Sequence, residues 1–115
     1  MKSPITSHVL DTMRGKPAPG VPAVLEMRSP NGEWTKIASG MTDTDGRMSD
    51  LLPEGHKLRT GSYRLTFDTA TYYAVSGQPT FYPTVQIVFE VHDANQHYHV
   101  PLLLSPFGYS TYRGS

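Results

Sequence analysis

Two histidines stand two positions apart near the C-terminal end of the sequence, at His97 and His99. Side chains of an extended strand alternate between its faces, so both imidazoles should share one face while Tyr98 and Val100 share the other. Histidine serves as a metal ligand, as an acid or base near neutral pH, or as an ordinary solvated side chain. The pair therefore indicates a metal site, acid–base catalysis or simple solvation.

A third histidine, His8, shows the same arrangement near the start of the sequence. It alternates with Ser7 and Val9, which we expect to face the core, so its ring should lie on the opposite face. We expect this first strand to lie beside the last-but-one strand of a sandwich, which would bring His8 to the face that carries His97 and His99. The three rings would then form one site across neighbouring strands.

Arg47 follows an Asp-Gly pair that is typical of a tight turn. On its own it would be a solvated loop cation. Its planar fork of donors also suits a carbonyl-rich or anionic ligand, and the nearby Asp43 and Asp45 are placed to orient the guanidinium. His56 and His92 lie in polar loops, where we expect them to be solvated.

The sequence keeps aromatic and charged residues up to its last position, which indicates an ordered segment where many small domains fray. Tyr112 lies in this expected terminal strand, and a buried phenol there would need a polar partner. We therefore expect the segment around Tyr112 to contribute to a site.

A β-rich scaffold must position these side chains. Apolar and polar residues alternate in short segments separated by turn-forming residues, and Asn31-Gly32 marks a hairpin. Residues 69–76 instead show helical spacing, with Gly77 as a cap. About eight strands and one short helix favour an all-β antiparallel sandwich, with a small barrel as the second choice. The longer expected strands span residues 5–11, 21–28, 34–41, 63–68, 81–92, 97–105 and 107–115.

Length and composition limit the classes of protein. A chain of 115 residues should form a single domain, residues 1–115. Ten basic and ten acidic residues are interspersed, which is unlike a nucleic-acid-binding protein, and the absence of cysteine excludes disulfides and thiolate chemistry. The sequence shows neither a membrane-spanning run nor an apolar leader, so we expect a soluble, cytoplasmic protein without nucleic-acid or membrane partners.

Four stretches of the sequence resemble the transthyretin-related 5-hydroxyisourate hydrolases, and the resemblance extends from Ile5 to Ser115. The terminal Tyr-Arg-Gly-Ser is the most specific, and together with His-Tyr-His-Val-Pro it separates the hydrolases from transthyretin itself. The Thr-Asp-x-Asp-Gly-Arg stretch is weaker, because many sandwich domains carry a similar turn. The four stretches are Ser7-His8-Val9-Leu10-Asp11, residues 42–47, residues 97–106 and Tyr112-Arg113-Gly114-Ser115.

The resemblance implies a transthyretin-like (prealbumin-like) sandwich that assembles as a homotetramer, with two dimers facing each other across a channel. It implies hydrolysis of 5-hydroxyisourate to 2-oxo-4-hydroxy-4-carboxy-5-ureidoimidazoline in urate degradation, a part of purine metabolism, without a metal or other cofactor. The implied catalytic residues are His8, Arg47, His99 and Ser115, and the implied substrate-binding residues are His8, Arg47, His97 and Tyr112.

In this interpretation His99 or His8 removes a proton from the attacking water, and Arg47 stabilises the developing charge on a ring carbonyl oxygen. Tyr112 narrows the pocket, and the Ser115 carboxylate is a candidate for orienting a histidine. Two alternatives stay open. One is a non-catalytic carrier of the transthyretin type, and the other is a zinc site formed by His8, His97 and His99 with one open coordination position.

Overall fold

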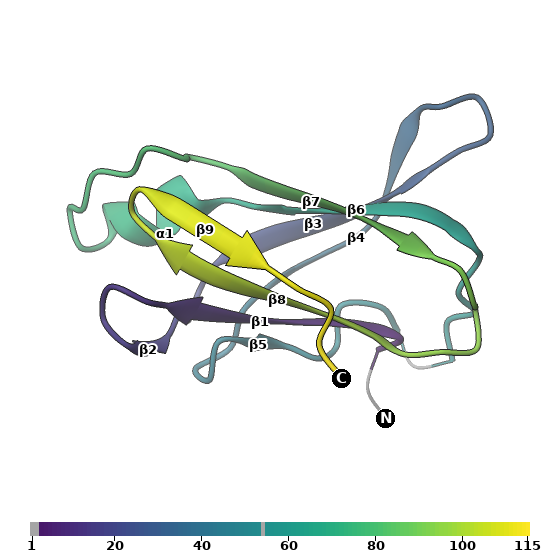
Figure 1. Ribbon diagram of the computed structural model, residues 1–115, viewed down its shortest axis with the longest axis horizontal. Coiled ribbons are helices and arrows are strands. Elements are labelled where there is room, and N and C mark those ends of the chain that lie inside the picture. The colour runs from purple at the N-terminus through teal and green to yellow at the C-terminus, as the bar shows by residue number, and fades with distance from the viewer. Residues whose placement is uncertain (1–2, 54) are drawn as a thin grey trace.

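The protein is described by a computed structural model that covers residues 3–53 and 55–115. Two β-sheets pack face to face, with one short helix at an end of the sandwich (Figure 1). One sheet has the order β2-β1-β8-β9, with β5 also paired to β1, and the other has the order β4-β3-β6-β7. The elements are β1 (Ile5–Asp11), β2 (Lys16–Pro17), β3 (Pro22–Arg28), β4 (Trp34–Met41), β5 (Arg47–Met48), β6 (Gly61–Phe67), α1 (Thr69–Ala74), β7 (Val85–Val91), β8 (Tyr98–Ser105) and β9 (Gly108–Thr111).

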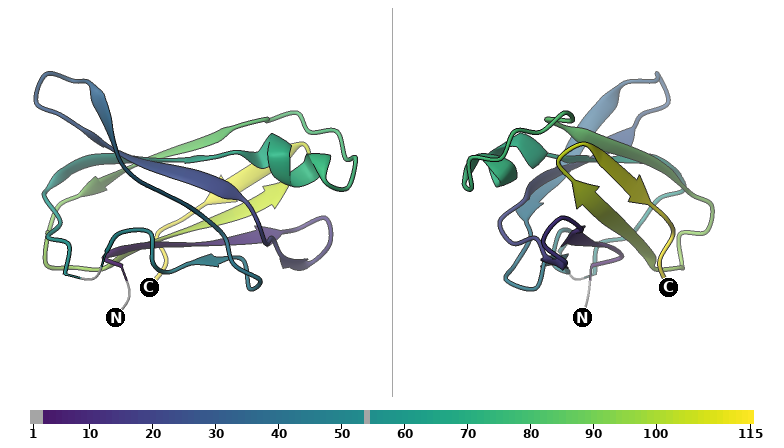
Figure 2. Two further views of the ribbon diagram at one scale, coloured as in Figure 1. Left: turned by 180° about the vertical axis from the view of Figure 1, so that it is seen from behind. Right: turned by 60° about the vertical axis from the view of Figure 1, so that its left-hand side comes forward.

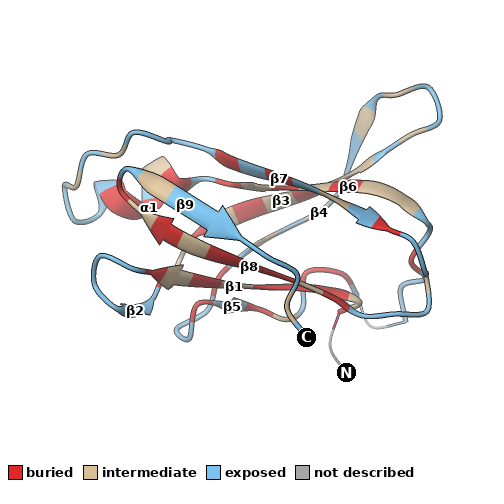
Figure 3. Cartoon of the chain, in the orientation of Figure 1, coloured by how far each residue is buried: buried red, intermediate tan, exposed pale blue. Residues whose placement is uncertain are grey.

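The core lies between the two sheets and is built from the alternation that the sequence shows. Val9 and Leu102 of the first sheet and Leu25 and Leu65 of the second are all fully buried. Figure 3 shows the same alternation as bands of buried and partly exposed residues along the strands. Burying one such side chain contributes roughly 1.5–3 kcal/mol, so the apolar set fixes which face of each strand points inward. The predicted β-sandwich is confirmed, although Thr6, Ser7 and Asp11 of β1 are polar residues that are buried.

The first and last-but-one strands are neighbours, as predicted. β1 and β8 pair over seven residues, from Ile5 opposite Tyr98 to Asp11 opposite Leu104, and Thr6 lies opposite His99. Figures 1 and 2 show the two strands side by side in each view. They run parallel, unlike every other strand pair in residues 3–53 and 55–115. A parallel pair needs a long crossover, and here the whole second sheet lies between the two strands in sequence.

Several element boundaries differ from those predicted. The strand expected from residue 81 begins at Val85, because the Phe81 N–H donates to the Pro106 carbonyl at 2.7 Å and Phe81 therefore lies against the turn after β8. The helix ends at Ala74, and Gly77 has a φ of 68° just beyond it. β9 ends at Thr111, so Tyr112 lies outside the terminal strand.

A buried carboxylate connects α1 to the end of β1. Asp11 is fully buried, and its side chain accepts hydrogen bonds from the hydroxyls of Tyr72 at 2.8 Å and Tyr73 at 3.4 Å. Burial, followed by the hydrogen bond and the negative charge of Asp11, raises the pKa of Tyr72 to about 12. Burial and the charge of Asp11 raise the pKa of Tyr73 still further above its ordinary value. Both phenols therefore stay neutral in the folded protein well above pH 10.

This cluster predicts a loss of stability in alkali. The unfolded tyrosines ionise near pH 10, so the stability that the neutral phenols contribute is complete below pH 10 and is lost as the pH rises through their raised pKa values. Urea unfolding at a series of pH values from about 9 to about 11.5 should show a steep fall in the free energy of unfolding. The Tyr72→Phe/Tyr73→Phe variant should show a shallower fall, and Tyr109→Phe, at an exposed position, should behave as wild type. Equal slopes for wild type and the double variant would contradict this.

Candidate active site

Strands β1, β5 and β8 and the C-terminal segment surround a cavity of about 80 Å³. Four of the residues predicted for the site line it: Arg47, His97, His99 and Ser115. They come from segments far apart in the sequence, and the parallel pairing of β1 with β8 brings them together. The other lining residues, which sequence reasoning missed, are Thr6, Ser7 and Ser49.

The hydroxyl of Thr6 lies between the two histidine rings of the site. Its Oγ1 is 3.1 Å from Nε2 of His97 and 2.8 Å from Nδ1 of His99. The two rings are nearly parallel, with an interplanar angle of 16° and centroids 6.5 Å apart. Thr6 is only 4% exposed, so it is held within the sheet. Its spacing of two residues from His8 was a signal that could have identified it.

His8 and Arg47 lie directly opposite each other on β1 and β5. Nε2 of His8 is 2.9 Å from the Asp45 carbonyl oxygen. A carbonyl only accepts hydrogen bonds, so Nε2 carries a proton and donates it, and a neutral His8 has its lone pair on Nδ1. His8 is thus adjacent to Arg47 but is not among the residues that line the cavity, and its ring contacts the turn before β5.

The turn that presents Arg47 is fixed by Asp43 and Gly46. The Asp43 carboxylate accepts hydrogen bonds from the backbone N–H groups of Asp45 at 2.8 Å and Arg47 at 2.9 Å. Gly46 has a φ of 73°, and a Cβ there would lie 2.5 Å from the Val9 carbonyl oxygen.

The expectation that Asp43 and Asp45 orient the guanidinium is wrong, because Asp43 instead orients the backbone of the turn. Among residues 3–53 and 55–115, no Asp or Glu side chain forms an ion pair with Arg47. Its positive charge is therefore left for a ligand.

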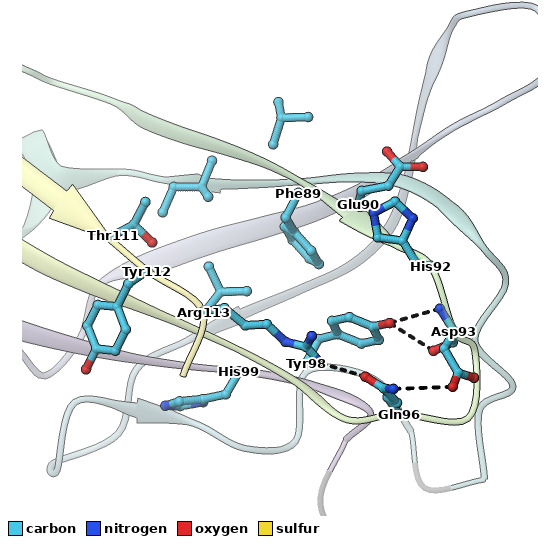
Figure 4. Close-up of a pocket in the computed structure, with 13 residues that line it drawn as sticks. Phe89, Glu90, His92, Asp93, Gln96, Tyr98, His99, Thr111, Tyr112 and Arg113 are labelled. Atoms are coloured by element: carbon cyan, nitrogen blue, oxygen red, sulfur yellow. Dashed lines mark hydrogen bonds between the residues drawn. The ribbon is translucent and has the colours of Figure 1, made fainter. Parts of the chain in front are cut away.

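The C-terminal segment folds back across β8 and is held at several points. The Gly114 N–H donates to the His99 carbonyl at 2.9 Å. The Arg113 guanidinium lies 4.5 Å from the centre of the Tyr98 ring and donates to Gln96 Oε1 at 2.9 Å (Figure 4). These contacts lead the chain to Ser115 at the cavity, and the expectation of an ordered segment is confirmed.

Tyr112 lines a second, larger cavity of about 560 Å³ beside the first. His99 contributes to both cavities, and Figure 4 shows it near Tyr112 below the Arg113 side chain. Tyr112 is 58% exposed, so its phenol is not buried within the chain. The larger cavity opens between the edge strands β7 and β9, with Phe89 and Tyr98 among its lining residues.

The remaining two histidines are exposed, as the sequence predicts. His56 lies in the loop before β6, and His92 follows β7 at the rim of the larger cavity. Neither lines the small cavity that contains His97 and His99.

The zinc hypothesis required His8, His97 and His99 to converge on one ion. In the part of the chain that the structure describes, no three histidine, aspartate or glutamate side chains gather closely enough to hold a metal. The ring of His8 contacts the Asp45 carbonyl, whereas the rings of His97 and His99 both contact Thr6.

The described residues include no helix that is long and apolar enough to cross a membrane.

Comparison with known proteins identifies the family. A family model described as the HIUase/Transthyretin family matches residues 5–114. A 5-hydroxyisourate hydrolase of Salmonella dublin is 49% identical over 111 residues, which cover 96% of this chain and 80% of that protein. The 5-hydroxyisourate hydrolase of Mus musculus is 45% identical over 114 residues, which cover 98% of this chain and 96% of that protein.

Two solved structures share the fold. Sea bream transthyretin in complex with thyroxine has a TM-score of 0.90 and 35% identity, covering 97% of this chain and 95% of that one. The 5-hydroxyisourate hydrolase of Klebsiella pneumoniae has a TM-score of 0.83 and 33% identity, covering 96% of this chain and 98% of that one. The sandwich is thus transthyretin-like, as the resemblance of the sequence implied. With a family model that matches nearly its whole length and relatives close to half identical, the chain belongs to the HIUase/transthyretin family.

Proposed function

We propose that this protein hydrolyses 5-hydroxyisourate to 2-oxo-4-hydroxy-4-carboxy-5-ureidoimidazoline, a step of urate degradation. The observation that carries the proposal is the gathering of Arg47, His97, His99 and Ser115 around one small cavity. Imidazoles can act as acid and base in the hydrolysis of a ring amide, and a cation can stabilise the negative charge that develops on the carbonyl oxygen. Relatives named 5-hydroxyisourate hydrolase at 45–49% identity support the same substrate.

Hydrolysis begins when a water oxygen bonds to a carbonyl carbon of the six-membered ring. The water must lose a proton as it attacks, and the ring nitrogen must gain one when its bond to carbon breaks. His99 is suited to take the proton and return it, because its ring lies at the cavity and Thr6 holds its Nδ1. Such acid–base catalysis accelerates a reaction by roughly 10² to 10⁴.

Arg47 is suited to hold the carbonyl oxygen that becomes negative during the attack. Its guanidinium forms no ion pair with an Asp or Glu side chain among the described residues, so its charge can act on the ligand. One well-placed donor to a developing oxyanion contributes roughly 3 kcal/mol. His8 stands beside Arg47 as a second substrate contact, and its Nδ1 is an alternative base.

The other predicted residues would shape and orient the site. His97 lies on the same side of β8 as His99 and would contact the substrate. Ser115 at the cavity is a candidate for orienting a histidine, and Tyr112 would narrow the entrance from the larger cavity.

A homotetramer formed by two dimers would complete the site. A cavity of about 80 Å³ is small beside the roughly 300–1000 Å³ of ligand pockets, so a bicyclic substrate needs further walls. The edge strands β7 and β9 and the exposed Phe81 and Phe107, both 68% exposed, offer surface that a partner would cover. Sedimentation velocity should give a single species of four chains.

A cytoplasmic location remains a prediction from the sequence.

The direct test is the loss of ultraviolet absorbance of freshly generated 5-hydroxyisourate. Added protein should accelerate this decay far beyond the spontaneous rate, in proportion to its concentration. A carrier of the transthyretin type would bind an aromatic ligand and leave the decay rate unchanged. Decay at the spontaneous rate would therefore refute the hydrolase and favour the carrier.

Gly114→Ala should strongly reduce turnover. A Cβ at Gly114 would lie 2.5 Å from Cδ2 of His99 and 3.2 Å from Cγ of Pro101, so either the C-terminal segment or the His99 ring must move. We expect kcat/KM to fall by about 10²-fold, since a displacement of about 1 Å in a catalytic site has an effect of that size. The absorbance assay measures this. Gly108→Ala, where the nearest atom is 3.6 Å away, is the matched control, and equal activity of the two variants would contradict the prediction.

A further inference from the structure

The hydroxyl of Thr6 is the only side-chain group that the structure places between His97 and His99 within the described residues. We infer that Thr6 is a positioning residue that fixes the proton positions of both histidines, so that Nδ1–H of His99 donates to Thr6 and Thr6 donates to Nε2 of His97. This inference rests on the proposed function, in which His99 is the base. It assigns a role to a residue that touches the two imidazoles and acts on the reaction through them.

The protons of the Thr6 hydroxyl and of the two imidazoles can be arranged in only a few ways. A hydroxyl has one proton to donate, and a neutral imidazole has one nitrogen that donates and one that accepts. Thr6 is 4% exposed, and the distances from its Oγ1 to the two ring nitrogens are 2.8 Å and 3.1 Å. A buried hydroxyl needs an acceptor for its proton, and the rings are its side-chain neighbours. Thr6 therefore donates to one ring and accepts from the other.

The role of His99 as the base decides whether Thr6 donates its hydrogen bond to His99 or accepts one from it. If Thr6 donated to Nδ1 of His99, the proton of the neutral ring would sit on Nε2, and neither nitrogen could take a proton from water. If Nδ1–H of His99 donates to Thr6, the lone pair is on Nε2, which can accept that proton. The proton of Thr6 then points to Nε2 of His97, whose own proton must be on Nδ1.

This arrangement also suits the step in which His99 becomes charged. The hydrogen bond from Nδ1–H to Thr6 becomes charge-assisted and stronger when the ring gains a proton, and no group has to rotate. Arg47, Ser7, Ser49 and Ser115 are the other residues that line the cavity, and His8 of β1 lies opposite Arg47.

The backbone sets the position of the hydroxyl. Thr6 lies directly opposite His99 in the parallel register of β1 and β8, and its branched side chain has few rotamers in a strand. The same pairing places Thr6 and His8 on one face of β1, two residues apart. Thr6 can therefore hold both rings without a loop having to order around them.

The first test is nitrogen NMR of the histidine rings in wild-type protein labelled with ¹⁵N. In the neutral state, His99 and His97 should both carry their proton on Nδ1, whereas the exposed His56 serves as the reference for an unconstrained ring. Thr6→Val should remove this preference at His99, and Thr6→Ser should preserve it. A neutral His99 with its proton on Nε2 in the wild type would overturn the inference, whether or not the variants fold.

The second test is kinetic and uses the same variants. Thr6→Val should lower kcat by about 10- to 100-fold, because it removes part of the roughly 10² to 10⁴-fold acceleration that acid–base catalysis supplies. The KM of this variant should change by less than about threefold. Thr6→Ser should keep kcat within about threefold of wild type. Thr66→Val is the matched control, because it removes a hydroxyl that has no hydrogen-bond partner in the described residues and lies on the other sheet.

The two tests separate the inference from the function on which it rests. A wild type that does not accelerate decay of 5-hydroxyisourate refutes the proposed function, and the NMR measurement then decides the proton positions by itself. A wild type that is active, with kcat of Thr6→Val equal to that of wild type, overturns the role of Thr6 and leaves the hydrolase standing.

Discussion

Replacing His99 with asparagine should lower kcat for 5-hydroxyisourate by about 10² to 10⁴-fold, the range that acid–base catalysis by a positioned side chain supplies. Asparagine can place a polar atom near the position of Nδ1 and keep a hydrogen bond to Thr6, which is 2.8 Å from that nitrogen in the wild type. It has no group that takes a proton from water at neutral pH. The substitution therefore removes the base while it preserves the contact with β1. Stopped-flow measurement of the absorbance decay gives kcat and KM separately.

His56→Asn is the matched control for this variant, because it makes the same replacement at an exposed loop position. It should have the kcat of wild type, and both variants should keep the melting temperature of wild type within a few degrees. Turnover by His99→Asn within about tenfold of wild type would remove His99 as the base. His8, whose Nδ1 carries the lone pair of the neutral ring, would then take its place.

Replacing Arg47 with glutamine should lower kcat/KM by about 10² to 10³-fold, the effect of losing one donor to a developing oxyanion. The guanidinium has no carboxylate side chain to neutralise it among the described residues, so its loss removes charge that acts on the ligand. Arg47→Lys should recover only part of the loss, because an ammonium group cannot reproduce a planar pair of donors. The same absorbance assay, over a range of substrate concentrations, measures both variants.

Arg59→Gln removes an exposed arginine of the loop before β6 and should leave kcat/KM unchanged. Wild-type activity in Arg47→Gln would show that the ligand does not use this charge. Nearly complete recovery in Arg47→Lys would instead show that a positive charge alone is sufficient, without the bidentate geometry.

The sequence predicted the strands best where alternation was strict and turn residues followed. The ranges expected for the first strand and for the strand after the hairpin match β1 (Ile5–Asp11) and β4 (Trp34–Met41). It was less successful at residues 81–84, where the composition is aromatic and suits a strand. There a long-range hydrogen bond to Pro106 decides the structure, and such a contact leaves no periodic signal.

For the site, residue types were easier to predict than ring orientations. The alternation of side chains along a strand placed His97 and His99 on one face of the strand. The burial of Tyr98 and Val100 on the other face confirms that assignment. The direction of the His8 ring depends on a carbonyl in a turn 37 residues away, which no pattern in β1 reveals. Thr6 was missed because threonine is common in strands. Its spacing of two residues from His8 places it on the same face, but its contact with the two histidine rings depends on the register of β1 with β8.

The pairing of β1 with β8 also has a consequence for biosynthesis. The hydrogen bond between Thr6 and His99 joins residues 93 positions apart, so β1 leaves the ribosome about 5 to 20 s before its partner at ordinary rates of translation. During that interval its edge is unpaired and can associate with other chains. Folding dominated by contacts of such high sequence separation is slow, on the scale of milliseconds to seconds. We therefore expect nascent chains of this protein to need a chaperone more than their small size suggests, and activity to appear only after the last strand is released.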